Sequence, residues 1–284
     1  MEQIVVRAYA KINLTLDIEG RRHDGYHLLN TVFQTVSIYD EITIEPSGNV
    51  VVTSDCAQLS DGPENLAHRA ACLMLELGEQ KQLKVKGAKI KIKKSIPLAA
   101  GLAGGSSDAA AVMNGINCLF GLGFTIAELM HHAVKLGADV PFCLLGGTAW
   151  GRGIGEKLSI LPALPKLWLV LCKPDLEVST AEIYKNYSGI RGRKYSSAFI
   201  SALEQGKKEE MLRNMGNVLE NVTLSSFPEV KKVKQKLLEA GAGKAVMCGS
   251  GPTVFAVCKD KAHAEKVAGE VGRTYRETFV VQTV

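Results

Sequence analysis

The sequence predicts an α+β protein made of two subdomains. Predicted strands gather in clusters and predicted helices follow one another in runs, without the regular βαβ alternation of a parallel sheet. The composition changes after about residue 158, where a proline-containing connector at 161–165 precedes a mainly helical remainder. A chain of 284 residues is long enough for one large domain or two of ordinary size.

The first strands are predicted from alternating apolar residues. Residues 5–16 alternate in patches, which predicts one or two strands broken near Lys11. Residues 32–38 and 41–45 predict an antiparallel pair joined by a turn at 39–40.

The later elements follow from periodicity and from helix-start signals. Thr125 with Glu128, and Ser179 with Glu182, have the spacing of capping boxes. Strict alternation within 90–94 predicts a strand with one buried face. The other predictions are helices over 65–77, 108–119 and 125–136, a lysine-bearing solvated helix face over 231–238, and strands over 148–152, 167–172, 245–247, 253–258 and 278–282.

Composition indicates a globular protein suited to small molecules. The hydrophobic fraction of 46% and the charged fraction of 22% exclude wholesale disorder. The formal net charge of +5 is mild, and no basic block is interleaved with aromatic residues, so a nucleic-acid groove is not indicated. A modestly basic cleft would suit phosphorylated small molecules. We expect no signal peptide and no membrane-spanning segment.

Cysteine and histidine usage gives no sign of a metal centre. The 7 cysteines are scattered without a Cys-x-x-Cys pair, so we expect reduced, mostly buried thiols in a cytoplasmic protein. His131 and His132 are neighbours in a predicted helix and therefore do not face the same way. We expect both at or near the surface.

The most informative segment is the run of small residues between the predicted strand 90–94 and the predicted helix 108–119. Glycine lets the backbone approach an anion and adopt φ > 0, and the N–H groups and dipole of a helix start favour negative charge. Ser106 and Ser107 add hydroxyl donors and suit the N-cap position. The segment predicts a phosphate-binding loop, or else a helix start that needs small residues for packing. Its members are Pro97, Leu98, Ala99, Ala100, Gly101, Leu102, Ala103, Gly104, Gly105, Ser106 and Ser107.

This loop is not that of a known P-loop or protein kinase. It contains no lysine, and Gly243-Lys244 is followed by Ala245 rather than Ser or Thr. His-Arg-Asp and Asp-Phe-Gly are also absent. Phosphate transfer by this chain would need another architecture.

Three further segments carry polar residues in unusual places. Lys11 and Asn13 share one side of an otherwise apolar strand, where they could simply face solvent. Asp139 follows a glycine that ends a predicted helix, so it could be a turn or N-cap residue. Residues 249–253 precede a strand, where they could form no more than a tight turn.

Taken together, these residues resemble the motifs of the GHMP small-molecule kinases, from Lys11 to beyond Thr253. Within that superfamily the chain is most similar to the branch that acts on a methylerythritol linked to cytidine diphosphate. Family loops often have glycine where this loop has Ala100 and Ala103, and alanine does not reach φ > 0 freely. The segments that carry the resemblance are 10–14, 97–108 and 249–253 for the superfamily, and 21–27, 137–142 and 178–182 for the branch.

The resemblance implies a fold and a reaction. It implies a two-lobe α+β fold with the active site in the cleft: a lobe similar to the second domain of ribosomal protein S5 over 1–158, and a GHMP kinase lobe over 159–284. The implied reaction is ATP-dependent phosphorylation of the tertiary 2-hydroxyl of the methylerythritol part, giving the 2-phosphate and ADP, in the non-mevalonate route to isoprenoid precursors. Mg²⁺ should accompany ATP without a dedicated carboxylate ligand. The implied protein is a monomer or weak homodimer, with no nucleic-acid or membrane partner.

The resemblance also implies residue roles in the reaction. The loop would hold the ATP phosphates, and Asp139 would accept the proton of the attacking hydroxyl. Lys11 would lie beside that hydroxyl and Asp139, keeping the carboxylate ionised. The turn 249–253 would close over the phosphates or the erythritol end.

Further roles concern substrate recognition. Tyr26 would stack on the cytosine and His27 would hydrogen-bond its edge. Asn13 and Thr180 match positions that touch the substrate, and Asn65 matches one that meets the adenine.

Three other functions fit the same motifs less well. A sister kinase acting on mevalonate, homoserine or a sugar would have no use for Tyr26 and His27. A non-catalytic nucleotide-binding regulator would not need both Lys11 and Asp139. A nucleic-acid module rests on likeness of fold alone.

Overall fold

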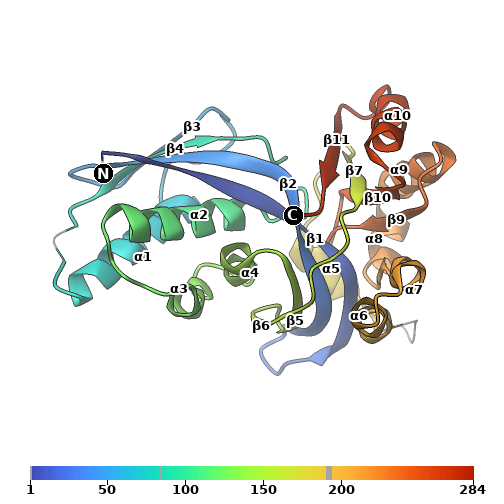
Figure 1. Ribbon diagram of the computed structural model, residues 1–284, viewed down its shortest axis with the longest axis horizontal. Helices are drawn as coiled ribbons and strands as arrows, with labels where there is room; N and C mark the ends of the chain where they lie inside the picture. Colours follow the sequence, from blue (N-terminus) through green and yellow to red (C-terminus); the bar gives the residue numbers. More distant parts are fainter. Residues whose placement is uncertain (1, 84, 190–193) are drawn as a thin grey trace. The chain divides into compact units, whose positions relative to one another are not determined.

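The computed structural model describes residues 2–83, 85–189 and 194–284. The chain divides into two compact units (Figure 1). Unit 1 consists of 1–10, 38–96 and 103–146, and unit 2 consists of 11–37, 97–102 and 147–284. Two long strands, β1 (Ile4–Arg21) and β2 (His27–Pro46), contribute residues to both units.

Both long strands are continuous, so two predictions are wrong. β1 is not broken near Lys11, and β2 replaces the predicted pair of short strands. Asp40, which suggested a turn, is fully buried within β2. Its carboxylate accepts hydrogen bonds from the backbone N–H groups of Ser95 and Ile96. A polar residue can stay inside a strand when buried donors satisfy it.

Unit 1 packs two helices on one face of its part of the sheet (Figure 1). β2 pairs antiparallel with β4, so that Ile42 faces Ile92 and Ile44 faces Ile90. A Cβ on Gly115 would lie 2.4 Å from Ile44 Cδ1, so the helix needs a small residue there. The elements of unit 1 besides β1 and β2 are β3 (Val51–Ser54), α1 (Leu66–Gln80), β4 (Ala88–Lys93), α2 (Gly104–Leu119), α3 (Ile126–Ala133) and α4 (Val140–Leu145).

Local signals marked the starts of α1 and α3 and the buried face of β4 correctly. Thr125 and Glu128 form both bonds of the capping box at the start of α3. Asn65 caps α1 by accepting from the backbone N–H of Ala67. β4 buries alternate residues, as its sequence predicted.

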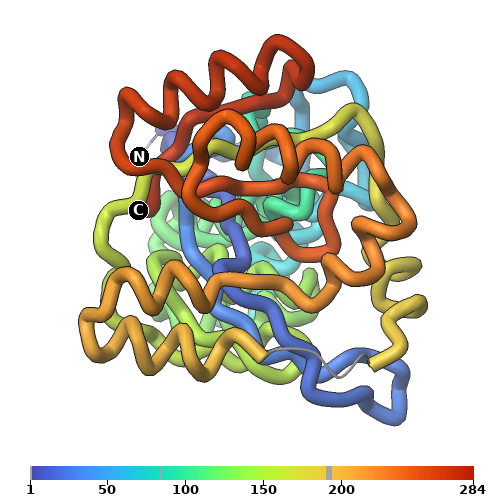
Figure 2. The backbone as a smooth tube through the Cα atoms, turned by 90° about the vertical axis from the view of Figure 1, so that its right-hand side faces the viewer, coloured from blue at the N-terminus to red at the C-terminus, as the bar shows by residue number. Residues whose placement is uncertain are grey.

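Unit 2 contains a four-stranded antiparallel sheet in the order β11-β7-β10-β9. Val170 and Ala256 belong to the same core as Val233 of α9 (Pro228–Glu239) and Val267 of α10 (Lys261–Gly272). Figure 2 shows α9 (orange) and α10 (red) as coils beside these strands. The strands of unit 2 are β5 (Thr148–Gly153), β6 (Lys157–Ile160), β7 (Trp168–Lys173), β8 (Gly216–Asn217), β9 (Lys244–Met247), β10 (Val254–Cys258) and β11 (Glu277–Gln282).

The other strands of unit 2 extend the sheet of the long strands. β5 pairs antiparallel with β2 and β6, and β8 pairs parallel with β1. The predicted connector 161–165 is neither helix nor strand. The helices of unit 2 are α5 (Thr180–Asn186), α6 (Ser196–Glu204), α7 (Lys208–Arg213), α8 (Glu220–Ser226), α9 (Pro228–Glu239) and α10 (Lys261–Gly272).

The cysteines, all of which lie in the described ranges, form no disulfide, but they are not mostly buried, which corrects the prediction. Cys172, Cys248 and Cys258 are buried, whereas Cys72 and Cys118 are exposed. The two exposed cysteines lie on the outer faces of α1 and α2. The number of cysteines in a sequence does not indicate which of them lie on such a face.

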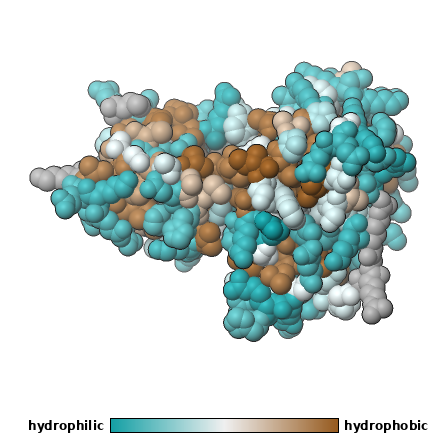
Figure 3. Space-filling view, turned by 60° about the horizontal axis from the view of Figure 1, so that its bottom comes forward, coloured by the Kyte–Doolittle hydropathy of each residue, from teal (hydrophilic) through white to brown (hydrophobic). Residues whose placement is uncertain are grey.

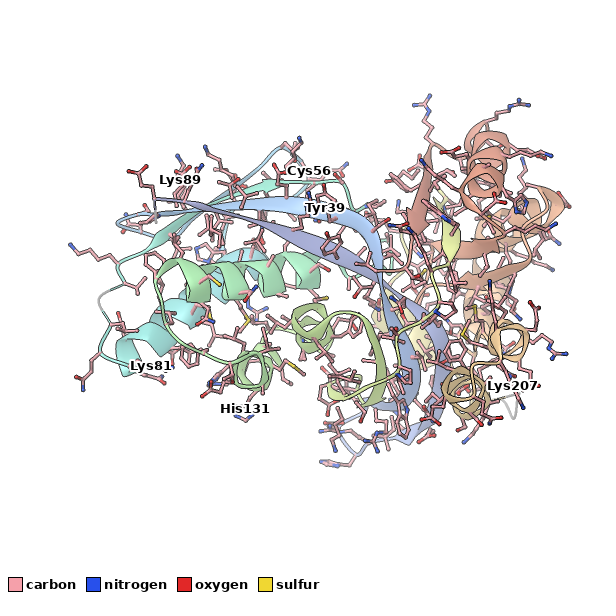
Figure 4. All side chains as sticks on the ribbon, viewed as in Figure 1. Tyr39, Cys56, Lys81, Lys89, His131 and Lys207 are labelled. Atoms are coloured by element: carbon pink, nitrogen blue, oxygen red, sulfur yellow. The ribbon has the colours of Figure 1, made fainter. Side chains whose placement is uncertain are left out.

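Surface exposure agrees with the prediction for His131. His131 is exposed on α3, as Figure 4 shows. Figure 3 shows hydrophobic surface (brown) between hydrophilic side chains (teal), which is ordinary for a folded chain. No helix in the described ranges is long and apolar enough to span a bilayer.

Candidate active site

Lys11 and Asn13 form a buried polar network on β1 in unit 2. They are 4% and 2% exposed, so the solvent-facing alternative is wrong. Lys11 Nζ donates to Asn13 Oδ1 at 3.0 Å, and Asn13 Nδ2 donates to Thr31 Oγ1 at 2.8 Å. The Lys11 ammonium also lies 5.2 Å from the centre of the Phe33 ring. Burying a lysine is costly unless partners hold it, so these contacts fix a charged donor inside the unit.

The first half of the glycine-rich loop, 97–102, packs against the turn 249–253 in unit 2. Gly101 has φ +73°, and a Cβ there would lie 2.6 Å from Cys248 O and 2.9 Å from Gly251 O. Leu102 O accepts the backbone N–H of Lys11 at 3.1 Å. The three segments that suggested the family are therefore in direct contact within this unit.

Thr180 also reaches the turn. Its Oγ1 lies 2.9 Å from Ser250 Oγ, and it begins α5 directly after the cap residue Ser179. Ser179 accepts from the backbone N–H of Glu182, which confirms the predicted helix start.

The second half of the loop is the start of α2 in unit 1. The helix begins at Gly104, four residues earlier than predicted, and Ala103 is its N-cap. Ser106 and Ser107 therefore lie inside the first turns and are not N-caps, which corrects the prediction. Ser107 Oγ instead donates to Tyr9 O at 2.7 Å. By helix geometry the N–H groups of Gly104, Gly105 and Ser106 have no acceptor within the helix, so they can bind an anion.

Two alanines in the loop adopt positive φ. Ala103 has φ 59° and Ala99 has φ 49°, whereas Ala100 is not among the positive-φ residues. Of the two alanines that replace the family's glycines, Ala103 adopts a strained positive φ and Ala100 does not. The left-handed region costs an alanine about 1–2 kcal/mol.

A buried charge cluster that the sequence did not reveal adjoins this helix start. Lys94 Nζ binds Asp108 Oδ2 at 2.8 Å and also binds Asp40 Oδ2. The side chains of Lys94, Asp40 and Asp108 are 7%, 0% and 2% exposed. A Cβ on Gly104 would lie 3.5 Å from Lys94 Nζ. The cluster therefore ties β2 and the end of β4 to the first turns of α2.

Burial raises the pKa of Asp108 to about 7, and the charge of Asp40 adds to the rise, while Lys94 opposes it. Burial acts to lower the pKa of Lys94, but the two carboxylates outweigh it and raise that pKa. Asp108 Oδ1 is buried without a hydrogen-bond partner among the described residues. Two carboxylates share one ammonium here, so the cluster retains a proton more readily than separate residues would.

Asp139 occupies the N-cap position of α4, but its side chain makes no capping bond. It is half-buried. Its segment runs beside the start of α2 in unit 1: a Cβ on Gly137 would lie 4.0 Å from Ser106 Oγ, and Cys143 Sγ is 3.4 Å from Ser107 Oγ. A capping role therefore does not account for this aspartate.

Tyr26 and His27 lie at the start of β2 in unit 2. Tyr26 is 60% exposed, so its ring offers an open face to a ligand. The His27 ring lies 5.4 Å from the ring of Tyr184 and 6.1 Å from that of Tyr187. Burial lowers the pKa of His27, and the charge of Arg21 lowers it further, which favours the neutral ring with one donor and one acceptor.

Tyr184 and Tyr187 were missed in the sequence. Both follow the Ser179 cap, at a spacing that places them on one side of α5 and its end. Only the folded chain shows that this side faces His27.

Asn65 has a structural role at the start of α1. Its Oδ1 accepts from Ala67 N at 2.8 Å and its Nδ2 donates to Ser60 O at 2.7 Å. Its side chain is 6% exposed.

The described residues do not form a protein cage for a metal ion. No group of three His, Cys, Asp or Glu side chains within 2–83, 85–189 and 194–284 could hold one. Magnesium commonly keeps its waters and binds through substrate phosphates. This arrangement is therefore compatible with a magnesium ion that arrives on a phosphorylated ligand.

Two family models match this chain in order. The model described as GHMP kinases N terminal domain matches 65–147, and that described as GHMP kinases C terminal matches 199–277.

Curated relatives match over the full length. A 4-diphosphocytidyl-2-C-methyl-D-erythritol kinase of Moorella thermoacetica is 45% identical over 100% of both chains. The enzyme of the same name from Pelotomaculum thermopropionicum is 44% identical over 99% of this chain and 98% of its own.

Solved structures also match nearly the whole of this chain. A crystal structure of 4-(cytidine 5'-diphospho)-2C-methyl-D-erythritol kinase has a TM-score of 0.83 and 35% identity, covering 99% of each chain. A homoserine kinase from Cytophaga hutchinsonii has a TM-score of 0.78 at 21% identity, covering 100% of this chain and 95% of its own, which shows likeness of fold alone.

Proposed function

Because this chain belongs to the 4-diphosphocytidyl-2-C-methyl-D-erythritol kinase family, within the GHMP kinases, we propose that it phosphorylates that substrate with ATP. The product is the 2-phosphate, formed with ADP in the non-mevalonate route to isoprenoid precursors. One observation carries the proposal: 45% identity over the whole length to an enzyme of this name. The contact of 97–102 with 249–253, and of Leu102 with Lys11, supports it.

The loop residues bind the phosphates of ATP in this proposal. The N–H groups at the start of α2 face an anion without competing acceptors in the helix. Gly101 allows the loop and the turn 249–253 to lie backbone to backbone, because no side chain separates them. The phosphate-binding residues are Pro97, Leu98, Ala99, Ala100, Gly101, Leu102, Ala103, Gly104, Gly105, Ser106 and Ser107.

Asp139 accepts the proton of the attacking hydroxyl, and Lys11 supplies positive charge to the oxygen that loses it. Asp139 belongs to unit 1 and Lys11 to unit 2, so the support for each role comes from the contacts within its own unit. The segment of Asp139 runs beside the start of α2, and Lys11 is buried beside Asn13. Phosphoryl transfer depends mainly on positioning and charge, and such acid–base groups contribute about a hundred- to ten-thousand-fold.

Tyr26, His27 and Tyr184 recognise the cytosine. An exposed tyrosine ring offers a stacking face, and neutral His27 offers a donor and an acceptor to the pyrimidine edge. Asn13 and Thr180 are proposed to contact the rest of the substrate. Asn65 is proposed to lie near the adenine, although its side-chain amide is engaged in capping α1.

The remaining features of the proposal are general ones. Mg²⁺ would accompany ATP without a protein cage and would supply positive charge to the phosphates. Seven free cysteines fit a reducing compartment, so we expect a cytoplasmic protein. We expect a monomer or weak homodimer, and functional lobes at 1–158 and 159–284.

Replacing Asp139 with Asn tests the proposed base. We expect turnover to fall about a hundred- to ten-thousand-fold while the protein stays folded, because the side chain keeps its size and only its basicity is lost. A coupled assay of ADP release measures this. Asp61→Asn, at an exposed position of unit 1, is the control. Near wild-type turnover in folded Asp139→Asn would exclude the role.

Lys11→Met tests the proposed charge. Turnover should fall while ATP still binds, since the phosphates are held by the loop. Lys91→Met, on the exposed face of β4, is the control. Loss of ATP binding in folded Lys11→Met would instead assign Lys11 to the nucleotide.

A further inference from the structure

We infer that Asn217 is a positioning residue of the active site, which holds the turn 249–253 against the glycine-rich loop and the Lys11–Asn13 pair. The inference rests on the proposed function for the meaning of those two segments. Asn217 does not touch the reacting groups and acts only through the turn. Every residue involved lies in unit 2.

The Asn217 side chain is 2% exposed and uses all of its main hydrogen-bonding groups. Nδ2 donates to Met247 O at 2.8 Å and to Gly249 O at 2.7 Å. Oδ1 accepts from Leu219 N at 2.9 Å. An amide has two N–H donors on one atom, so asparagine alone among residues of this size can serve two carbonyls and one N–H here. The reversed amide would set its oxygen against two carbonyl oxygens.

Backbone pairing fixes where this amide stands. Asn217 belongs to β8, which pairs parallel with β1, Leu16 opposite Asn217. Val218 N donates to Leu16 O at 3.0 Å. The position of the amide is thereby tied to the same strand that carries Lys11 and Asn13.

The turn that Asn217 holds lies between the two functional segments. A Cβ on Gly249 would stand 3.6 Å from Gly101 O and 3.7 Å from Asn13 Oδ1, which is van der Waals contact. A Cβ on Gly101 would lie 2.6 Å from the oxygen of Cys248, which precedes the turn, and 2.9 Å from Gly251 O within it. A shift of the turn therefore moves the loop, the Asn13 amide, or both.

Thr223 adds a second and weaker tether. Its Oγ1 donates to Ser250 O at 3.1 Å, and its side chain is fully buried. Loss of the single bond from Thr223 should therefore reduce activity, but by less than loss of the two bonds from Asn217.

Asn117 supplies a matched control. Its Nδ2 donates to Phe124 O at 2.9 Å and its Oδ1 accepts from Phe124 N at 3.0 Å. It therefore fastens a backbone loop by the same chemistry, in unit 1, at the C-terminal end of α2. Replacing either asparagine should lower the stability of the protein, but only replacement of Asn217 should also reduce its function.

The test compares Asn217→Ala, Asn217→Asp and Asn117→Ala with the wild type. Thermal unfolding measures stability, calorimetry measures the dissociation constant of ATP, and a coupled assay measures kcat and KM for both substrates. Asn217→Asp keeps the volume and the acceptor but replaces the two donors. We expect both Asn217 variants to bind ATP at least about tenfold more weakly, and to lose about a hundredfold in kcat/KM, because small misplacements near the chemistry have effects of that size.

Asn117→Ala should unfold at a lower temperature and keep both constants within about twofold of the wild type. If folded Asn217→Asp also keeps them within about twofold, the inference is wrong. If the Asn217 variants do not fold, Thr223→Val decides: a loss of several-fold in kcat/KM supports the inference, and wild-type values overturn it.

ATP binding separates this inference from the proposed function. If the wild type binds ATP but does not phosphorylate the cytidyl substrate, the proposed function fails, and the ATP affinities of the Asn217 and Asn117 variants still decide the inference. Absence of ATP binding by the wild type would overturn both.

Discussion

The two ends of the glycine-rich loop are fixed by different means. The first end, 97–102, is fixed by backbone contact: Gly101 lies directly against the carbonyls of Cys248 and Gly251. The second end begins α2 and is fixed by side chains: Ser107 bonds Tyr9 O, and Asp108 bonds the buried Lys94. The first end therefore requires a residue without a side chain at Gly101. The second end requires the polar side chains of Ser107 and Asp108.

This difference explains why the two ends tolerate alanine differently. Ala103 carries its Cβ at φ 59° as the cap of α2. Gly101, at φ +73°, has no room for one. The strain of the left-handed region is moderate and can be borne, but overlap with two carbonyl oxygens cannot be relieved without moving the backbone.

The largest effect should come from the side-chain end, at Lys94. Lys94→Met leaves Asp40 and Asp108 buried without their shared cation, so we expect a loss of about 3–5 kcal/mol in the free energy of unfolding. Urea unfolding measures it. Lys93→Met, at the neighbouring exposed position, should change little. A change below about 1 kcal/mol in Lys94→Met would show that the charge cluster does not fix this end.

A second large effect is expected at the backbone end. Gly101→Ala should lower the free energy of unfolding by more than about 2 kcal/mol, because positive φ and steric overlap add. It should also weaken ATP binding. For stability alone, Gly105→Ala is the control at the other end, because its Cβ would meet only Leu66 Cδ1, at 3.6 Å. Equal losses in the two variants would remove the distinction between the ends.

The charge cluster should also give the side-chain end a pH dependence. The pKa of Asp108 is raised to about 7 by burial and by Asp40, so the folded chain holds a proton that the unfolded chain has released. Its stabilising contribution is present below the ordinary aspartate pKa and is lost as pH rises through about 7.

Asp108→Asn removes this proton. The difference in unfolding free energy, wild type minus Asp108→Asn, should therefore fall as pH rises from about 4 to 8. Urea titrations at several pH values measure it. A difference that is flat or that rises with pH contradicts the assignment.

The smallest effect is expected at Ala103. Ala103→Gly should stabilise the protein by roughly 0.5–1 kcal/mol, because glycine adopts the left-handed cap without strain. Ala100→Gly, at a position without positive φ, should destabilise it by a similar amount. Thermal unfolding of the two variants measures the sign of each change in stability. The same sign in both would show that φ does not determine whether glycine stabilises the loop.

The parts of the fold that sequence predicted have their causes close by in the chain. The loop, the Asn65 and Thr125 helix starts and the alternation of β4 each depend on a few consecutive residues. The missed features join distant ones. Asp40 stays inside a strand because its acceptor role is filled from Ser95, 55 positions away.

The candidate site follows the same rule. Lys11 and Asn13 were recognisable as polar residues in an apolar strand, but their burial depends on Thr31 of another strand. The approach of Tyr184 to His27 and the contact of Gly101 with 249–253 arise only on folding. Local patterns therefore predicted the glycine-rich loop and the role proposed for it, while the residues that position the loop were found only in the structure.

A single assay tests the central claim most directly. Purified protein is incubated with ATP and Mg²⁺ and, separately, with 4-diphosphocytidyl-2-C-methyl-D-erythritol, mevalonate, homoserine and a hexose, and ADP release is followed with and without cytidine diphosphate. We predict turnover with the cytidyl substrate alone, inhibited by cytidine diphosphate and lost in Asp139→Asn. Turnover with another alcohol that is indifferent to cytidine diphosphate would contradict the proposed function.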